Sequence, residues 1–130
     1  MILIDTSAWV EFLRDTGSPA CERVDALLGS GMATCDAIRM EVLAGARDDA
    51  HVRQLARLLD RATLLPTDSV DYEAAATIYR HCRGEGRTVR KLIDCLIAAV
   101  AIRAGVPVLH RDVDFAAIAA ATELSIDPAS

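Results

Sequence analysis

Four short apolar runs alternate along the chain with longer segments in which apolar and polar residues recur at helical spacing. The runs cover residues 2–4, 32–35, 63–65 and 106–109. Each is bounded by polar residues, glycine or proline and is too short for a helix, so each predicts a buried strand. Strands that alternate with helices favour a parallel sheet with crossover connections. The pattern therefore predicts one α/β domain, residues 1–130, in which helices flank a small parallel sheet (α/β/α).

The segments between the runs predict the helices. Trp9, Val10 and Leu13 share one face of a first helix, which Thr6 or Ser7 is expected to cap. We expect Asp36 to cap the third helix. Further helices are expected at residues 19–29, 36–46, 49–60, 69–83, 92–105 and 115–120, with a candidate edge strand at 124–126.

Composition narrows the class of protein. With 130 residues, 52% of them hydrophobic, the chain can build a real core and is not disordered. No apolar stretch reaches the roughly 18–20 residues of a membrane-spanning helix, and the first residues lack the basic flank and cleavage site of a signal peptide. We therefore expect a cytoplasmic protein with no membrane partner. The net charge of −5 argues weakly against broad affinity for nucleic acid.

The cysteines do not indicate a metal site. They lie far apart in the sequence, without a C-x-x-C pair, and no histidine lies at ligand spacing from them. We expect reduced and mostly buried thiols. The four residues are Cys21, Cys35, Cys82 and Cys95.

Asp94 is the most informative polar residue. It is the only charged residue in the run 92–102, which reads as a helix that is apolar on nearly every face. Such a helix is normally buried, and an ionised carboxylate is rarely buried without a partner. A metal ion is a leading candidate for that partner.

Other acids stand at the ends of predicted elements. Asp5 and Asp112 each follow a short apolar run, where open α/β sheets place their ligand sites. Taken singly, Asp5, Asp112 and Asp114 could be helix caps, and Glu41 could be a surface residue. Because the two residues after Asp5 already offer capping hydroxyls, we expect Asp5 to point outward from its strand. The joint occurrence of these acids favours a shared site.

A cluster of carboxylates has a definite chemistry. Two carboxylates about 4 Å apart repel by about 4 kcal/mol at an effective dielectric near 20, so three or four stay ionised only around a cation. Surroundings made only of carboxylate oxygen favour Mg²⁺, with Mn²⁺ as a possible substitute. Such a pocket suits phosphodiester hydrolysis, because the metal neutralises charge that grows on the phosphate.

Basic residues gather just before the Asp94 helix, opposed only by Glu85. They could form a solvated helix end or a basic rim beside the acidic pocket. In the second interpretation Arg87, Arg90 and Lys91 would hold the phosphate backbone of a substrate. The full set is Arg80, Arg83, Arg87, Arg90 and Lys91.

The opening, Ile-Leu-Ile-Asp-Thr-Ser-Ala-Trp-Val-Glu at residues 2–11, resembles that of PIN-domain ribonucleases, specifically the VapC toxins of bacterial toxin–antitoxin pairs. The resemblance covers the whole chain. It includes Glu41 in the segment 38–45, Asp94 in 92–99, and Asp112 and Asp114 near the end. These four motifs, in this order and at this length, are highly specific.

The resemblance implies a fold, an activity and partners. The fold is a parallel sheet flanked by helices, and the activity is Mg²⁺-dependent cleavage of RNA. The partners are a cognate antitoxin and a second copy in a homodimer, for which the helix at 69–83 and the start of the Asp94 helix are the expected contact. The antitoxin is expected to insert an apolar helix with a basic side chain that reaches the acids.

The resemblance also implies roles for individual residues. Asp5 and Asp94 resemble the main metal ligands, with Asp112 nearby. Glu41 would activate water or hold the metal through water, and Asp114 would support the cluster. On the substrate side of the site, the hydroxyl groups of Thr6 and Ser7 would orient Asp5.

One position departs from the family pattern. Many relatives have Thr or Ser after the last strand, where this chain has His110 and Arg111. His110 either contacts phosphate or closes the loop, and Arg111 is expected to pair with an acid when RNA is absent.

Two other functions stay open. One is a PIN-type RNA-processing nuclease without an antitoxin, and the other is a non-catalytic acidic metal-binding module. An aspartyl-phosphate phosphatase is disfavoured, because it would need a D-x-D directly after the first strand.

Overall fold

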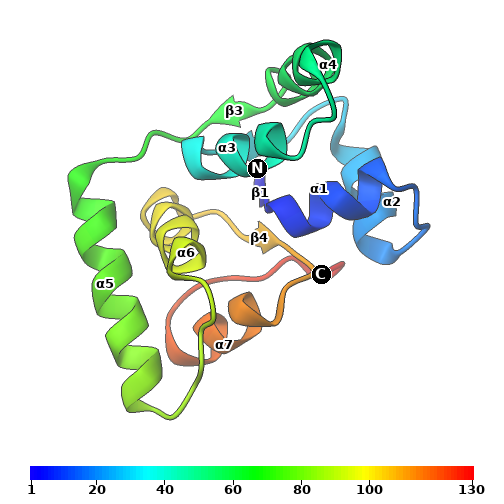
Figure 1. Cartoon of the computed structure of the whole chain (residues 1–130). Coiled ribbons are helices and arrows are strands. Elements are labelled where there is room, and N and C mark those ends of the chain that lie inside the picture. Colours follow the sequence, from blue (N-terminus) through cyan, green and yellow to red (C-terminus); the bar gives the residue numbers. More distant parts are fainter.

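A computed structural model describes all 130 residues. Its sheet has four parallel strands in the order β3-β2-β1-β4 (Figure 1). The strands are β1 (Ile2–Ile4), β2 (Met32–Thr34), β3 (Thr63–Leu64) and β4 (Val108–Leu109). The helices are α1 (Thr6–Leu13), α2 (Pro19–Leu27), α3 (Asp36–Ala44), α4 (Asp49–Leu59), α5 (Ser69–Gly84), α6 (Leu92–Ala104) and α7 (Val113–Ala121).

Strand β1 lies inside the sheet between β2 and β4. Leu3 pairs with Ala33 of β2 on one side and with Val108 of β4 on the other. All three residues of β1 are buried, whereas both residues of β3, at the sheet edge, are exposed. Because β1 and β4 are parallel neighbours, the residues that follow them come to the same edge of the sheet.

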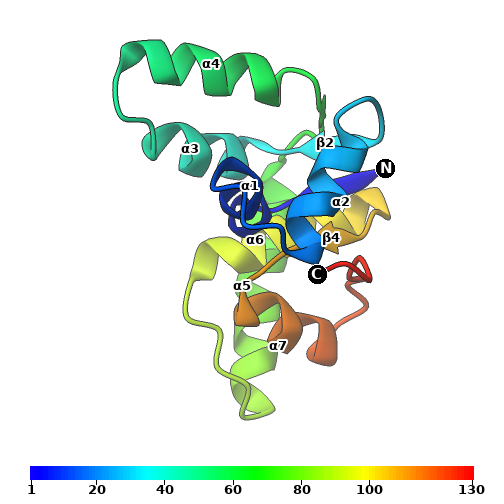
Figure 2. The ribbon, with the colours of Figure 1, turned by 90° about the vertical axis from the view of Figure 1, so that its right-hand side faces the viewer.

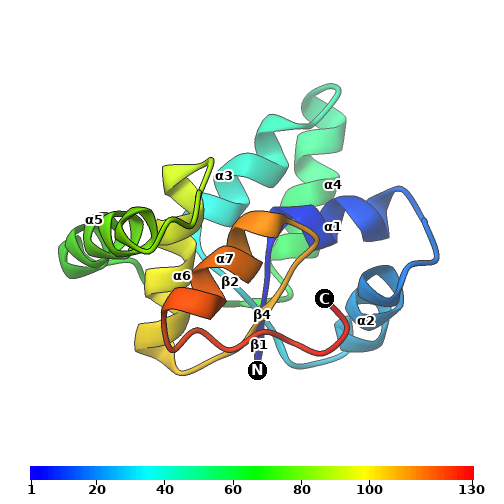
Figure 3. The ribbon, with the colours of Figure 1, turned by 90° about the horizontal axis from the view of Figure 1, so that it is seen from below.

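Helices cover both faces of the sheet. In Figure 3, α5 and α6 lie on one side and α1 and α2 on the other. Helices α3 and α4 run antiparallel at the end of the molecule opposite to α7 (Figure 2). Helix α6 is the most buried, with seven of its residues inside the core, and the left-handed residue Gly105 (φ 68°) ends it. The predicted α/β/α arrangement of one domain is confirmed.

The ends of several elements differ from the predictions. Helix α7 begins at Val113, two residues early, because Asp112 caps it. Asp36 is the first residue of α3 and not its cap, which is Cys35. The expected edge strand at 124–126 is only a single bridge between Ile126 and Val108.

The four cysteines are free and buried, as the sequence predicted. Burial raises the pKa of Cys35 to about 11 and that of Cys95 to about 12, so both thiols stay protonated at neutral pH. None of the helices combines the length and the apolar character that crossing a membrane requires.

Candidate active site

Three acids from two parts of the chain meet where β4 ends and α6 and α7 begin. Asp94 lies in the first turn of α6, Asp112 directly before α7, and Asp114 in the first turn of α7. Each offers a carboxylate oxygen within 4.8 Å of the others. Of the acids predicted to meet in space, Asp94 and Asp112 lie in this group and Asp114 joins them, whereas Asp5 and Glu41 lie outside it.

Asp94 is buried, with 1% of its surface exposed. Its Oδ2 atom has no hydrogen-bond partner, and the Lys91 ammonium lies 3.6 Å from that atom. Burial raises the pKa of Asp94 to about 8, and the hydrogen bond with Asp114 and the charge of Asp5 also raise it. Without a metal, this side chain therefore carries a proton at neutral pH, and a bound cation would favour its ionised form.

Asp114 is fully buried and holds the segment that precedes α6. Its Oδ1 accepts the amide of Arg90 at 3.1 Å, and its Oδ2 accepts the amide of Lys91 at 3.0 Å. Burial raises the pKa of Asp114, but the Arg90 amide and the hydrogen bond with Asp94 bring it below its ordinary value. Because both oxygens bind backbone amides, Asp114 mainly positions the start of α6 against the site.

Asp112 caps α7 and binds two cations. Its Oδ1 accepts the amide of Asp114 at 2.9 Å and the Arg90 guanidinium at 3.0 Å. Its Oδ2 lies 2.7 Å from the Lys91 ammonium. Burial raises the pKa of Asp112, but the hydrogen bonds from Lys91 and from the Asp114 amide bring it below its ordinary value. Asp112 is therefore ionised and already paired.

Asp5 caps α1, which contradicts the expectation that Thr6 or Ser7 would do so. Its Oδ2 accepts the amide of Ser7 at 2.9 Å as well as the Ser7 hydroxyl. The reason is geometric: Asp5 has extended backbone angles and stands one residue before the first helical residue, which is the N-cap position. The other oxygen, Oδ1, is buried without a partner. Asp5 thus caps the helix and still offers one free oxygen.

The two hydroxyls after Asp5 orient acids and link elements. Ser7 donates to Asp5 and accepts the amide of Arg111 at 2.8 Å, which joins the end of β1 to the end of β4. Thr6 donates to Oε1 of Glu41 at 2.9 Å. The prediction that both hydroxyls orient Asp5 is therefore wrong for Thr6, which orients Glu41.

Glu41 lies on α3 beside Asp5. Burial raises its pKa, the Thr6 hydrogen bond opposes that rise, and the negative charge of Asp5 adds to it. Glu41 is thus a half-buried acid in the field of other acids, and not the isolated surface residue that its position alone would allow.

His110 closes the loop after β4. Its Nδ1 accepts the amide of Asp112 at 3.1 Å, and its ring centroid lies 5.3 Å from that of Phe115. Burial lowers its pKa, so the ring is neutral at pH 7. Of the two roles that the sequence left open, this geometry favours loop closure. Arg111 pairs with an acid, as expected, but that acid is Glu11, at 3.7 Å.

The basic cluster before α6 divides into two parts. Arg90 and Lys91 turn into the acids, as described above. The other three arginines are exposed at the end of α5 and after it, as in the solvated interpretation, and Arg87 lies 3.9 Å from Glu85. Sequence reasoning missed the pairing of Arg90 and Lys91 with the acids. One signal was available, because Lys91 stands three residues before Asp94, a spacing at which opposite charges meet on a helix.

The site has the features that a divalent cation requires. Two carboxylate oxygens, Oδ1 of Asp5 and Oδ2 of Asp94, are buried without any hydrogen-bond partner. An unpaired buried carboxylate is costly unless a cation or a proton compensates it. The donor set contains only oxygen, which suits hard cations. The residues present therefore fit a divalent metal ion.

Comparisons with known proteins agree with this geometry. The PIN domain family model matches residues 2–121. Ribonuclease VapC11 of Mycobacterium tuberculosis is 51% identical in an alignment of 128 residues, and the match covers 95% of this chain and 96% of that protein. Among solved structures, FitAcB from Neisseria gonorrhoeae has a TM-score of 0.77 at 21% identity and covers 99% of this chain and 98% of its own.

A second solved structure, VapBC-5 from Mycobacterium tuberculosis, has a TM-score of 0.64 at 27% identity and covers 95% of this chain and 94% of its own. The family model and the relative that is 51% identical each span nearly the whole chain. This chain therefore belongs to the PIN-domain family and, within it, to the VapC ribonucleases.

Proposed function

We propose that this protein is a Mg²⁺-dependent endoribonuclease and the toxin of a toxin–antitoxin pair. The single observation that carries the metal requirement is the presence of two buried carboxylate oxygens without hydrogen-bond partners, one on Asp5 and one on Asp94. The relative that is 51% identical bears the name ribonuclease, which supports RNA as the substrate. We further propose that the protein acts in the cytoplasm.

The acids have different roles in this proposal. Asp5, Asp94 and Asp112 would hold the ion, while Asp114 keeps the start of α6 in place through the amides of residues 90 and 91. When bound, Mg²⁺ would neutralise charge that grows on the phosphate and lower the pKa of an attacking water molecule. Glu41, whose pKa is raised, is poised to accept a proton from that water.

A groove next to the acids suits an antitoxin. It has a volume of about 480 Å³ and runs between α1, α3 and α4. Trp9, Val10 and Leu13 form part of its apolar lining, and the hydrogen-bonded pair of Thr6 and Glu41 also lines it. We propose that an apolar helix of the antitoxin lies in this groove with a basic side chain directed at the acids.

A homodimer is also part of the proposal. Large apolar side chains are exposed on α5 and at the start of α6, among them Val70, Tyr72 and Leu92, each more than half exposed. Together with Ile93 and Leu96, Tyr72 and Leu92 line a shallow apolar hollow of about 260 Å³. Burial of this surface against a second copy would stabilise the pair through the hydrophobic effect.

Cleavage of total RNA tests the proposed function. The purified chain should cut RNA in the presence of Mg²⁺. Cleavage should stop when a chelator is added in excess and should resume when Mg²⁺ is restored. Gel mapping of the products would show internal cuts. RNA that stays intact in Mg²⁺ and in Mn²⁺ would contradict the proposal, as would cleavage that a chelator does not affect.

Metal binding should depend on pH below about 8. Asp94 has a pKa of about 8 without metal and must lose its proton to bind the ion. Its proton therefore competes with the metal, and the affinity should rise by up to about tenfold per pH unit from pH 6 to pH 8 and then level off. Titration calorimetry in two buffers of different ionisation enthalpy should detect one proton released per ion at pH 7. An affinity that does not change between pH 6 and pH 8 would contradict a raised pKa for Asp94.

A further inference from the structure

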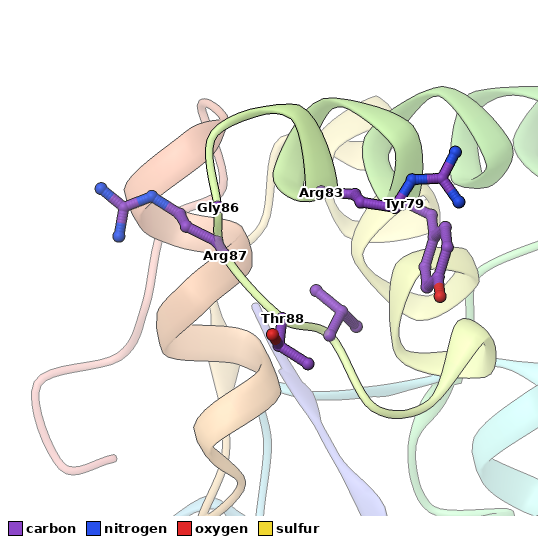
Figure 4. Close-up of a pocket in the computed structure, with 6 residues that line it drawn as sticks. Tyr79, Arg83, Gly86, Arg87 and Thr88 are labelled. Atoms are coloured by element: carbon purple, nitrogen blue, oxygen red, sulfur yellow. The ribbon is translucent and has the colours of Figure 1, made fainter.

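A small pocket opens where α5 ends and the segment 85–91 begins (Figure 4). It has a volume of about 240 Å³, below the range of about 300–1,000 Å³ typical of sites for drug-sized ligands. Gly86, at φ 74°, adopts the left-handed conformation that this turn requires. The pocket is lined by Tyr79, Arg83, Gly86, Arg87, Thr88 and Val89.

Two of the lining groups offer flat surfaces. The guanidinium of Arg83 lies over the ring of Tyr79, 5.8 Å from its centroid. Figure 4 shows these two side chains together on the α5 side, with Thr88 across from them and Arg87 directed away from Tyr79. Aromatic rings and guanidinium planes are the surfaces on which proteins stack the unpaired bases of single-stranded RNA.

The charge of the pocket also favours a nucleotide. No acid lines it, and Arg83 forms no ion pair; the one ion pair of Arg87 is the 3.9 Å contact with Glu85. In a chain with a net charge of −5, this uncompensated positive charge is local. Only two of the six lining residues are hydrophobic, which disfavours an apolar helix of a partner protein as the occupant.

The pocket is fixed relative to the acids. The amide of Arg87 donates to the carbonyl of Cys82 at 2.8 Å, which holds the turn against α5. Val89 is buried, and the next two residues give their amides to Asp114. The same short segment thus lines the pocket with residues 86–89 and binds Asp114 through the amides of residues 90 and 91, which places the pocket next to the acid cluster along the chain.

From these observations we infer that this pocket binds one unpaired nucleotide of the RNA substrate, with its base stacked on Tyr79 and Arg83 and its phosphate near Arg87. The inference rests on the proposed ribonuclease function. It identifies a contact with the substrate outside the acid cluster, and it implies that the enzyme prefers single-stranded RNA over a duplex.

Binding of RNA to non-cleaving protein tests this inference. Each variant is made in an Asp94→Asn background and titrated into a fluorescent pool of random 12-nucleotide RNA, with anisotropy as the readout. Tyr79→Leu should weaken binding about fivefold or more, and Tyr79→Phe, which keeps the ring, should bind like the Asp94→Asn protein. Arg83→Met should weaken binding and reduce the slope of log K against log salt by about 0.7.

The matched control is Arg80→Met, which removes an exposed arginine from the same helix outside the pocket and should change the affinity less than twofold.

Pocket variants that bind RNA like this control overturn the inference, even where the unsubstituted chain cuts RNA. A loss of dimer or of antitoxin binding at unchanged RNA affinity would make the pocket a protein contact and would also overturn it. If the unsubstituted chain does not cut RNA, the proposed function and this inference fall together. Tyr79 is half-buried, so thermal melting is needed to check that the Tyr79 variants fold. Arg83 is exposed, so its variant tests RNA binding without a comparable effect on folding.

Discussion

Asp94→Asn should reduce metal-dependent RNA cleavage by about 100-fold or more and leave the fold intact. The substitution keeps the volume of the side chain and removes the charge that a metal would bind. At pH 7 without metal, the parental Asp94 is already protonated, because its pKa is about 8, so the asparagine replaces a neutral group. Unfolding of the parent at pH 7 releases this proton, whereas asparagine is neutral in both states, so in metal-free buffer the variant should melt at a higher temperature than the parent at pH 7.

A difference in stability should appear as the pH rises. The pKa of Asp94 in the folded protein lies above its ordinary value of 3.8, so its contribution to stability is fully present below about pH 3.8 and is lost as the pH rises through about 8. In metal-free buffer the melting temperature of the parent should thus fall below that of the variant as the pH rises from about 4 to about 8, and the difference should stay constant at higher pH. Added Mg²⁺ should raise the melting temperature of the parent by mass action and leave that of the variant almost unchanged.

Asp60→Asn is the matched control, because this acid is exposed and pairs only with Arg39, away from the acid cluster. It should keep both the cleavage and the response to Mg²⁺. An Asp94→Asn protein that melts far below the parent at pH 7, with or without metal, would show that Asp94 is a structural residue. Cleavage at the parental rate would exclude it from the site.

Lys91→Met should bind Mg²⁺ more tightly than the parent at pH 9 and be less stable than the parent without the ion. The ammonium lies 2.7 Å from Oδ2 of Asp112 and 3.6 Å from Oδ2 of Asp94, so it serves as a counter-ion for the acids that would hold the metal. An ion that binds there must displace it. The loss of stability should be about 1–2 kcal/mol, below the value for a fully buried pair, because the lysine side chain is 48% exposed.

The measurement needs pH 9 because Lys91 also lowers the pKa of Asp94. Below pH 8, removal of the lysine would strengthen proton binding to Asp94, and this would mask the gain in metal affinity. Titration calorimetry gives the affinity and thermal melting the stability. Arg87→Met removes a nearby cation that does not touch the acids and should leave the Mg²⁺ affinity unchanged. Equal or weaker Mg²⁺ binding by Lys91→Met at pH 9 would mean that the lysine does not compete with the metal.

Much of the architecture follows from local patterns. Short apolar runs marked all four strands, although β3 and β4 are shorter than expected, and helical spacing marked all seven helices to within about two residues. The candidate edge strand at 124–126 failed because the hydrogen bonds of this segment go to β4 at isolated points, and its apolar alternation alone cannot show this. Proximity of Asp5 and Asp112 could be predicted as well, since they follow strands that are parallel neighbours.

The sequence by itself determined that Asp94 is buried and that acids collect at one edge of the sheet. Hydrophobic burial depends on which residues share a face, and spacing along the chain reports this directly. Only the tertiary structure decided which partners these acids take. Asp114 binds amides 23 and 24 residues away, Lys91 enters the acid cluster, and Asp5 divides its two oxygens between a helix cap and the site. Hydrogen bonds and ion pairs depend on distances of a few ångströms between groups remote in the chain, and no periodicity of the sequence encodes those distances.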